Sequence, residues 1–316
     1  MKDKISMIIT LLVVITLGTL GFVFSSGVST NQIETLKILG IICASSMAFC
    51  FIVGEITRNN SQMDKLWSIL PIAYVWVVCA MSHFNPRTLI IAILVTLWGI
   101  RLTYNFAKKG AYSIKFWSGE EDYRWVYLRK QKGFSNKFVW CIFDLLFISI
   151  FQNIVVLGIC LPSVAVMESA SPIGAFDIVA TILMAGFLLL EIVADYQQNK
   201  FQVKKYEYLN SGKKLNELPE PYNRGFNVKG LWGVMRHPNY LGEQGFWVSL
   251  FLFTIGAGVN NYFIFNWSMF GAILLIMVFV GSSRMAESMS NKKYLEYHEY
   301  QNRVFKYLPF RKYIKK

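Results

Sequence analysis

The sequence predicts an all-α protein, a polytopic transmembrane helical bundle of about seven or eight spans with cytoplasmic loops and a short C-terminal interfacial helix. Of the 316 residues, 54% are hydrophobic and only 16% are charged, whereas about 25% of the residues in an average soluble domain are charged. The hydrophobic residues also form uninterrupted blocks of about twenty, which is the length that crosses a hydrocarbon core. Together these observations argue against a soluble domain.

Eight hydrophobic blocks are expected to form spans, with ends that are loose by several residues. They comprise residues 5–24, 36–56, 66–82, 88–106, 138–161, 173–195, 241–256 and 262–282. The first block could instead be a secretory signal, but its apolar stretch is long and no Ala-x-Ala site follows it. The five cysteines all lie inside these blocks, so a disulfide scaffold is not expected.

The basic residues follow the predicted topology. The net charge is +13, and most Lys and Arg lie at the N-terminus, at the C-terminus and in alternate loops. The opposite loops, residues 162–172 and 257–261, contain no Lys or Arg. The positive-inside rule therefore places both termini in the cytoplasm, with Lys37, Arg87 and Arg101 as exceptions. Nucleic acid is not an expected partner, because the basic residues do not form one face.

A polar stripe enters the sixth predicted span. Glu191, Asp195, Gln198 and Gln202 are spaced i, i+4, i+7 and i+11, so they share one side of a helix. An ionisable group near the centre of a membrane helix costs about 2.5–3.5 kcal/mol on insertion scales. The stripe is therefore expected to face the protein interior or water, although a solvated cytoplasmic helix end is the alternative.

The densest group of polar residues lies in residues 230–243. Pro238 suits the first turn of a helix, which places Arg236 and His237 beside the positive end of the helix dipole. Such a helix start favours a phosphate group, although anchoring to lipid headgroups is the alternative. The next turns add three more candidate ligand-binding side chains, which are Asn239, Tyr240 and Glu243. No metal site is expected, since the three histidines have no metal-ligand spacing.

These motifs resemble a known family. Residues 230–243 resemble the signature of membrane proteins grouped with the C-terminal domain of steroid 5α-reductases, in particular a bacterial branch. Residues 98–102, 121–124, 194–201 and 297–309 resemble the same group in the same order. The first apolar blocks predict an N-terminal transmembrane hairpin at residues 1–60. The resemblance covers roughly residues 64–310 and implies a steroid-reductase-like domain at residues 61–316, whose residues 173–316 bind NADPH on the cytoplasmic side.

The resemblance also implies roles for single residues. Asp195, Asn239 and Arg284 match residues that hold NADPH in the reductases, and Arg236, His237 and Tyr240 resemble cofactor residues of the sterol reductases. Tyr294 matches a cofactor-contacting Tyr after a shift of one residue. We add Glu191 and Glu243 as cofactor-binding candidates because of their positions in the two polar segments.

The candidate catalytic residues differ from the family pattern. Asp64 and Trp98 stand where steroid 5α-reductases have a Glu and a Tyr that hold the carbonyl of the substrate. An indole N–H is a much poorer proton source than a phenol. This difference argues against a 4-en-3-one steroid as substrate, but not against another activated double bond. Asp64 as a plain helix cap is the alternative.

The favoured function is an NAD(P)H-dependent oxidoreductase that reduces a carbon–carbon double bond of a lipid-soluble, steroid-like or isoprenoid substrate. The main alternative is an S-adenosylmethionine-dependent methyltransferase of the isoprenylcysteine or phospholipid type. A transporter or a non-catalytic membrane protein is a third class, but the inverted repeats of transporters are not visible. We expect a multi-pass protein of the bacterial cytoplasmic membrane whose partners are the bilayer and a small lipid-soluble substrate, with no obligate protein partner.

Overall fold

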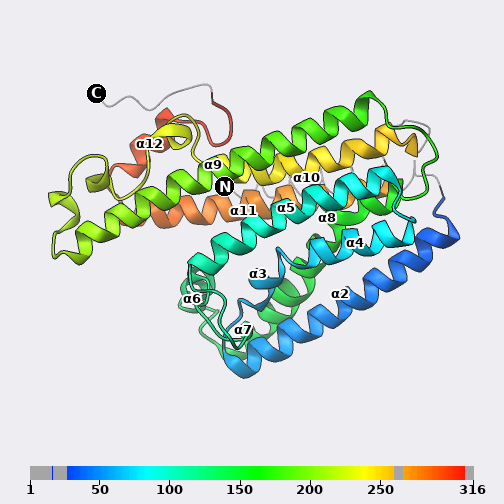
Figure 1. Cartoon of the computed structure of the whole chain (residues 1–316). Helices are drawn as coiled ribbons and strands as arrows, with labels where there is room; N and C mark the ends of the chain where they lie inside the picture. Colours follow the sequence, from blue (N-terminus) through cyan, green and yellow to red (C-terminus); the bar gives the residue numbers. More distant parts are fainter. Residues whose placement is uncertain (1–15, 17–26, 260–265, 310–316) are drawn as a thin grey trace. The chain divides into compact units, whose positions relative to one another are not determined.

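The computed structural model describes residues 16, 27–259 and 266–309, and every regular element in these ranges is a helix (Figure 1). The longer helices are α2 (Thr30–Thr57), α4 (Leu70–Met81), α5 (Pro86–Lys108), α8 (Gln152–Val166), α9 (Ala175–Asn210), α10 (Pro238–Gly256) and α11 (Phe270–Lys293). The short α-helices are α3 (Gln62–Leu66), α6 (Tyr123–Arg129), α7 (Lys137–Phe143) and α12 (Tyr297–Arg303). A π-helix, η1 (Asp144–Phe151), joins α7 to α8, and 3₁₀ turns are η2 (Leu215–Glu217), η3 (Tyr222–Arg224), η4 (Gly230–Gly233) and η6 (Trp267–Met269).

Within the described residues, five helical segments are long and apolar enough to cross a membrane. They are Thr30–Thr57, Pro86–Lys108, Lys137–Val166, Ala175–Asn210 and Trp267–Lys293. This confirms the predicted all-α transmembrane bundle, with fewer full-length apolar helices than the eight expected blocks. The block at residues 5–24 lies outside the described residues. The α4 helix has only 12 residues, and the first half of α10 carries Asn239, Glu243 and Gln244, which lowers its hydropathy.

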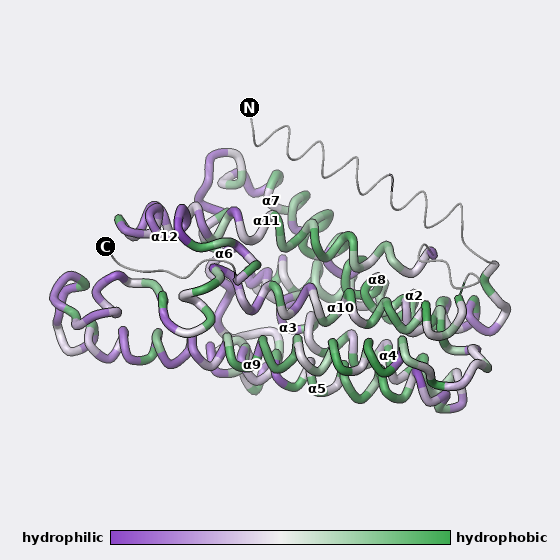
Figure 2. The backbone as a smooth tube through the Cα atoms, turned by 90° about the horizontal axis from the view of Figure 1, so that it is seen from above, coloured by the Kyte–Doolittle hydropathy of each residue, from purple (hydrophilic) through white to green (hydrophobic). Residues whose placement is uncertain are grey.

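Two helices differ from the sequence-based expectation, α9 in its length and α12 in its packing. The α9 helix continues to Asn210, well beyond the expected span end at residue 195, because its hydrophilic later turns need no membrane to remain helical (Figure 2). The α12 helix is the expected short helix near the C-terminus, but it buries Tyr297 and Tyr300 against Phe226 and Val304. Its aromatic residues are therefore packed inside the protein.

The chain divides into two compact units. Unit 1 comprises Met1–Thr181 and Val248–Leu275, and unit 2 comprises Ile182–Trp247 and Ile276–Lys316. In unit 1, α2 packs on α4, on η1 and on α8, and α4 packs on α5. The α8 helix also meets the start of α11 at two glycines. A Cβ atom on Gly158 would lie 2.9 Å from the Cα of Gly271, so this close approach requires glycine.

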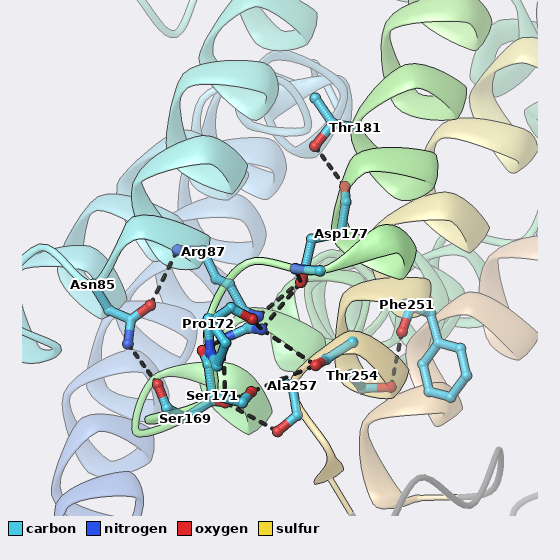
Figure 3. A network of polar contacts seen from close by, with 12 residues as sticks. Asn85, Arg87, Ser169, Ser171, Pro172, Asp177, Thr181, Phe251, Thr254 and Ala257 are labelled. Carbon is cyan, nitrogen blue, oxygen red and sulfur yellow. Dashed lines mark hydrogen bonds and ion pairs between the residues drawn. The ribbon is translucent and has the colours of Figure 1, made fainter.

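A buried ion pair holds several segments of unit 1 together (Figure 3). The Arg87 and Asp177 side chains are each 1% exposed, and Arg87 Nε donates to Asp177 Oδ1 at 2.8 Å. The same guanidinium donates to the carbonyl oxygens of Ser171, Pro172 and Gly256 at 2.6, 2.7 and 3.2 Å. Arg87 was an exception to the predicted charge topology, and this pairing accounts for its position within the protein.

Candidate cofactor site

All nine predicted cofactor residues belong to unit 2. They are Glu191 and Asp195 of α9, Arg236 and His237 before α10, Asn239, Tyr240 and Glu243 of α10, Arg284 of α11, and Tyr294 before α12. Glu191, His237 and Glu243 are buried, and Asp195, Arg236, Asn239, Tyr240 and Tyr294 are partly buried, whereas Arg284 is exposed. The predicted set therefore falls on four neighbouring stretches of one compact unit.

Glycines bring α9 and α10 together at the polar stripe. A Cβ atom on Gly242 would lie 2.4 Å from Glu191 Cγ and 3.0 Å from the carbonyl oxygen of Phe187. A Cβ atom on Gly245 would lie 2.5 Å from the Phe187 ring. Real Cβ atoms do not approach so closely, because the contact would be sterically repulsive. These glycines therefore place the start of α10 directly against Glu191.

The segment before α10 is fixed to α9 by hydrogen bonds. Leu231 N donates to Gln197 Oε1 at 2.9 Å, and Trp232 Nε1 donates to the Ala194 carbonyl oxygen at 3.0 Å. Gly230 has a φ of 61° and lies against the Gln197 side chain, a conformation and a close contact that suit glycine. The Gly-Leu-Trp part of the motif thus positions the residues that follow it.

Arg236 forms a buried cluster with the C-terminal segment. Its Nε donates to Glu287 Oε1 at 2.8 Å, and its Nη1 donates to the carbonyl oxygens of Gln301 and Val304 at 2.9 and 2.5 Å. Gln301 Nε2 donates to the other Glu287 oxygen at 3.0 Å. Among the described contacts of Arg236, Nη2 makes no hydrogen bond. Arg236 therefore connects three segments of unit 2, and its Nη2 can still donate a hydrogen bond to a ligand.

His237 shares the carboxylate of Glu287. Its Nε2 lies 2.9 Å from Glu287 Oε1, and its backbone N–H donates to the Lys306 carbonyl oxygen at 3.0 Å. Its ring stacks on Tyr240 at 5.0 Å between centroids. Burial lowers the pKa of His237 below its usual value, although Glu287 opposes that shift. His237 is therefore neutral at physiological pH, and the charge of Arg236 is balanced by Glu287.

This geometry refines the predicted phosphate site. The sequence favoured a cluster in which Arg236 and His237 both contribute positive charge, but Glu287 occupies the position between them. Glu287 was not among the predicted site residues, because its two partners lie 50 and 51 residues earlier in the chain. The sequence feature that could have indicated Glu287 is its position one helical turn after Arg284, near the end of an apolar helix.

Other side chains of unit 2 offer hydrogen-bond acceptors. Asn239 Oδ1 and Gln198 Oε1 are buried and make no hydrogen bond to any described residue. A buried acceptor without a donor is unfavourable, so these two oxygens are suited to a ligand or to water. Glu243 instead accepts a hydrogen bond from Trp247 Nε1 at 3.1 Å. Tyr294 packs on Phe226 and against Gly225.

The predicted catalytic residues lie in unit 1. Asp64 is 9% exposed on α3, and it accepts hydrogen bonds from Trp125 Nε1 at 2.5 Å and from Arg124 Nη2 at 3.0 Å. Burial raises the pKa of Asp64, and the charge of Arg124 opposes this shift. Trp98 is fully buried on α5. Arg124 belongs to the acidic motif singled out in the sequence, whereas Trp125 is an additional neighbour of Asp64.

Comparison with known proteins identifies the family. Residues 50–304 match the family described as a protein of unknown function, DUF1295. The chain belongs to the DUF1295 family. An uncharacterized protein of the fission yeast Schizosaccharomyces pombe is 34% identical over 279 residues, which cover 82% of this chain and 77% of the yeast protein. No solved structure matches the chain.

The DUF1295 match covers both sets of predicted site residues. It begins within α2 and ends after α12, so the polar cluster around Asp64 and the cluster around Arg236 are both parts of the DUF1295 region. The relative is eukaryotic, so the comparison gives no support to the expectation of a bacterial membrane. The described residues contain no group of three or more His, Cys, Asp or Glu side chains that could hold a metal ion.

Proposed function

We propose that this DUF1295 protein is an integral-membrane NAD(P)H-dependent reductase that acts on a carbon–carbon double bond of a lipid-soluble substrate. The motifs that resemble the steroid 5α-reductase-like proteins lie almost entirely within the DUF1295 match. The proposal is carried mainly by unit 2, where two buried acceptors without donors, Asn239 Oδ1 and Gln198 Oε1, occur together with the predicted cofactor residues.

The residues of unit 2 fit the groups that a dinucleotide presents. Ribose hydroxyls and the nicotinamide carboxamide are hydrogen-bond donors, which the Asn239 and Gln198 oxygens and the Asp195 carboxylate would accept. The remaining Arg236 nitrogen suits a phosphate oxygen, because a charged donor makes a strong hydrogen bond with an anion. When bound, NADPH supplies a hydride for the reduction.

Asp64 is the proposed substrate-binding group of unit 1. A carboxyl group whose pKa is raised by burial keeps its proton to a higher pH, so it is suited to donate a hydrogen bond to a carbonyl oxygen. Arg124 and Trp125 hold this carboxyl in one orientation through two hydrogen bonds. Trp98 is proposed to line the apolar part of the substrate site, since an indole ring suits an apolar ligand.

The proposed orientation follows the charge distribution. The basic termini and the long polar segments would lie in the cytoplasm, as the positive-inside rule predicts. Unit 2 contains the hydrophilic end of α9 and the basic C-terminal segment. This orientation would give the cofactor residues access to the cytoplasmic pool of dinucleotides.

A parallel binding measurement tests the proposal. Purified full-length protein in detergent is titrated with NADPH and with S-adenosylmethionine by isothermal calorimetry. We expect NADPH to bind, and Asn239→Ala and Asp195→Ala to weaken that binding by about tenfold, since each substitution removes one or two ligand hydrogen bonds. Asn199→Ala is the matched control, because Asn199 is exposed on the same helix as Asp195. Binding of S-adenosylmethionine without NADPH would overturn the proposal in favour of methyl transfer.

A further inference from the structure

Another buried carboxylate of unit 1 lies in the apolar segment Lys137–Val166, between α7 and α8. Asp144 is the first residue of the π-helix η1 and is 1% exposed. Neither of its carboxylate oxygens makes a hydrogen bond to a described residue. Burying a carboxylate without a hydrogen-bond donor is costly, and single π-helical turns in α-helices are frequent at functional sites. The carboxylate is therefore left without a hydrogen bond of normal geometry.

An unused donor lies beside this carboxylate. Asn60 Oδ1 accepts hydrogen bonds from Arg129 Nη2 at 2.9 Å and from Trp140 Nε1 at 3.1 Å. These two donors fix the orientation of the amide, and its Nδ2 is buried without a hydrogen bond. The Asn60 amide is a hydrogen-bonding neighbour of Asp144, but the two side chains do not form a hydrogen bond of normal geometry.

Both unsatisfied groups meet at a glycine. A Cβ atom on Gly54 of α2 would lie 3.3 Å from Asn60 Nδ2 and 3.5 Å from Asp144 Oδ2. Any larger residue at this position would therefore crowd the donor and approach the acceptor. Gly54 lies in the last turn of α2, and the absence of a side chain there leaves both polar groups uncrowded.

The polar face continues along the same helix. Ser149 Oγ and Asn153 Oδ1 are fully buried and also lack hydrogen-bond partners among the described residues. Asn153 is held in place, because its Nδ2 donates to the Ser149 carbonyl oxygen at 2.7 Å. This face packs on α2, where the thiol of Cys43 contacts the Asn153 carbonyl oxygen at 3.7 Å.

We infer that Asp144 and Asn60 form a binding site for the hydroxyl group of a lipid-soluble alcohol. A hydroxyl group can donate its proton to one Asp144 oxygen and accept a hydrogen bond from Asn60 Nδ2 at the same time. It would thereby satisfy both buried groups, and its hydrocarbon part would contact the apolar residues of α2 and η1. The inference deepens the proposed function, since it names the substrate class as an alcohol, and it rests on that function for the reaction itself.

The test compares an alcohol with an ether that cannot donate a hydrogen bond. Equilibrium binding to the full-length protein in detergent is measured for radiolabelled geranylgeraniol and cholesterol, and for the methyl ether of each. We expect at least one alcohol to bind about tenfold more tightly than its ether, as a hydrogen bond to a charged group allows. Asp144→Asn should weaken this preference, because an amide oxygen is a weaker acceptor than a carboxylate and the shape of the side chain changes little.

Two glycine variants supply the matched control. Gly54→Ala places a methyl group against Asn60 Nδ2 and Asp144 Oδ2 and should weaken alcohol binding by about tenfold or more. Gly40→Ala lies in the same helix, and its new Cβ would meet nothing within 4 Å, so it should leave binding unchanged. Because alanine favours helix formation, loss of binding by Gly54→Ala would not reflect a weaker helix.

The outcomes separate this inference from the proposed function. Equal affinity for alcohol and ether in both pairs, or no binding of either alcohol, would overturn the inference. A preference that survives unchanged in both Asp144→Asn and Gly54→Ala would also overturn it, because the carboxylate would then hold an internal water only. NADPH affinity should be unchanged in these variants. Loss of NADPH binding by the wild-type protein, with the alcohol preference intact, would remove the proposed reductase but keep the hydroxyl site.

Discussion

The two buried arginine–carboxylate clusters differ in how completely the protein satisfies them. Nε, Nη1 and Nη2 of Arg87 all donate hydrogen bonds within unit 1, and the side chain is 1% exposed. Arg236 uses Nε and Nη1, has an 11% exposed side chain, and shares its carboxylate with a titratable histidine. A fully satisfied pair fixes the architecture, whereas a pair with unused hydrogen-bonding capacity beside other unsatisfied groups is suited to a ligand.

The largest expected effect is at the fully satisfied pair. Arg87→Ala should lower the free energy of unfolding by about 3–5 kcal/mol, because it leaves the Asp177 carboxylate buried without its charge partner. The measurement is denaturant unfolding in detergent, followed by tryptophan fluorescence. The double variant Arg87→Ala/Asp177→Ala should lose less stability than the sum of the single variants, because neither buried charge then remains alone.

A surface ion pair provides the control for that measurement. Lys37 and Glu34 form a salt bridge at 2.8 Å with side chains 62% and 54% exposed. Lys37→Ala should give no measurable change in unfolding, since exposed pairs contribute little. A loss at Arg87 as small as the loss at Lys37 would contradict the structural role of the buried pair.

The second expected effect is on ligand affinity at the partly satisfied pair. Arg236→Ala should weaken NADPH binding by about 10- to 100-fold, because it removes a charged donor to the phosphates and loosens the C-terminal segment. Arg303→Ala is the matched control, since Arg303 pairs with Glu299 on α12. An unchanged NADPH affinity for Arg236→Ala in a folded protein would place Arg236 with Arg87 as a purely architectural residue.

The third prediction compares two glycines of α10, one beside Asp177 of the Arg87 cluster and one beside Glu191 of the candidate cofactor site. A Cβ atom on Gly256 would lie 2.8 Å from Asp177 Oδ1, and one on Gly242 would lie 2.4 Å from Glu191 Cγ. Each substitution by alanine should destabilise the protein by about 1–3 kcal/mol through crowding. Only Gly242→Ala should also lower NADPH affinity, measured by calorimetry on the folded fraction. Gly186→Ala is the control, because its Cβ would meet nothing within 4 Å.

Sequence patterns predicted the elements that depend on local composition. The apolar blocks predicted most of the membrane helices, and Pro238 marked the first residue of α10. The spacing of Glu191 and Asp195 predicted a helical stripe, and α9 carries both residues. These features depend on length, periodicity and the fixed φ of proline, which a sequence shows directly.

The contacts that complete each cluster could not be predicted, because they join distant parts of the chain. Arg87 and Asp177 lie 90 residues apart, and His237 and Glu287 lie 50 residues apart. The π-helix at Asp144 also changes the helical register, so a pattern based on 3.6 residues per turn does not show that Asp144, Ser149 and Asn153 share a face. The contact between Trp125 and Asp64 was not predicted either, because these residues lie 61 positions apart in the chain.

The smallest expected effect is a pH dependence that only one cluster should show. Burial lowers the pKa of His237 in the folded protein, so the unfolded chain binds a proton more readily than the folded one. The stability contributed by neutral His237 is therefore fully present above the unfolded pKa of about 6.5 and is lost as the pH falls through the lower folded pKa. Unfolding free energies measured in detergent at a series of pH values should show this loss in the wild-type protein, and His237→Gln should remove it because glutamine does not titrate. The Arg87 cluster contains no histidine, so Asp177→Asn should leave the pH profile in this window unchanged in shape. The raised pKa of Asp64 contributes with the opposite sign in both proteins, so the test is the difference between the wild-type and His237→Gln profiles. A difference that does not change with pH would show that His237 does not set the contrast between the two clusters.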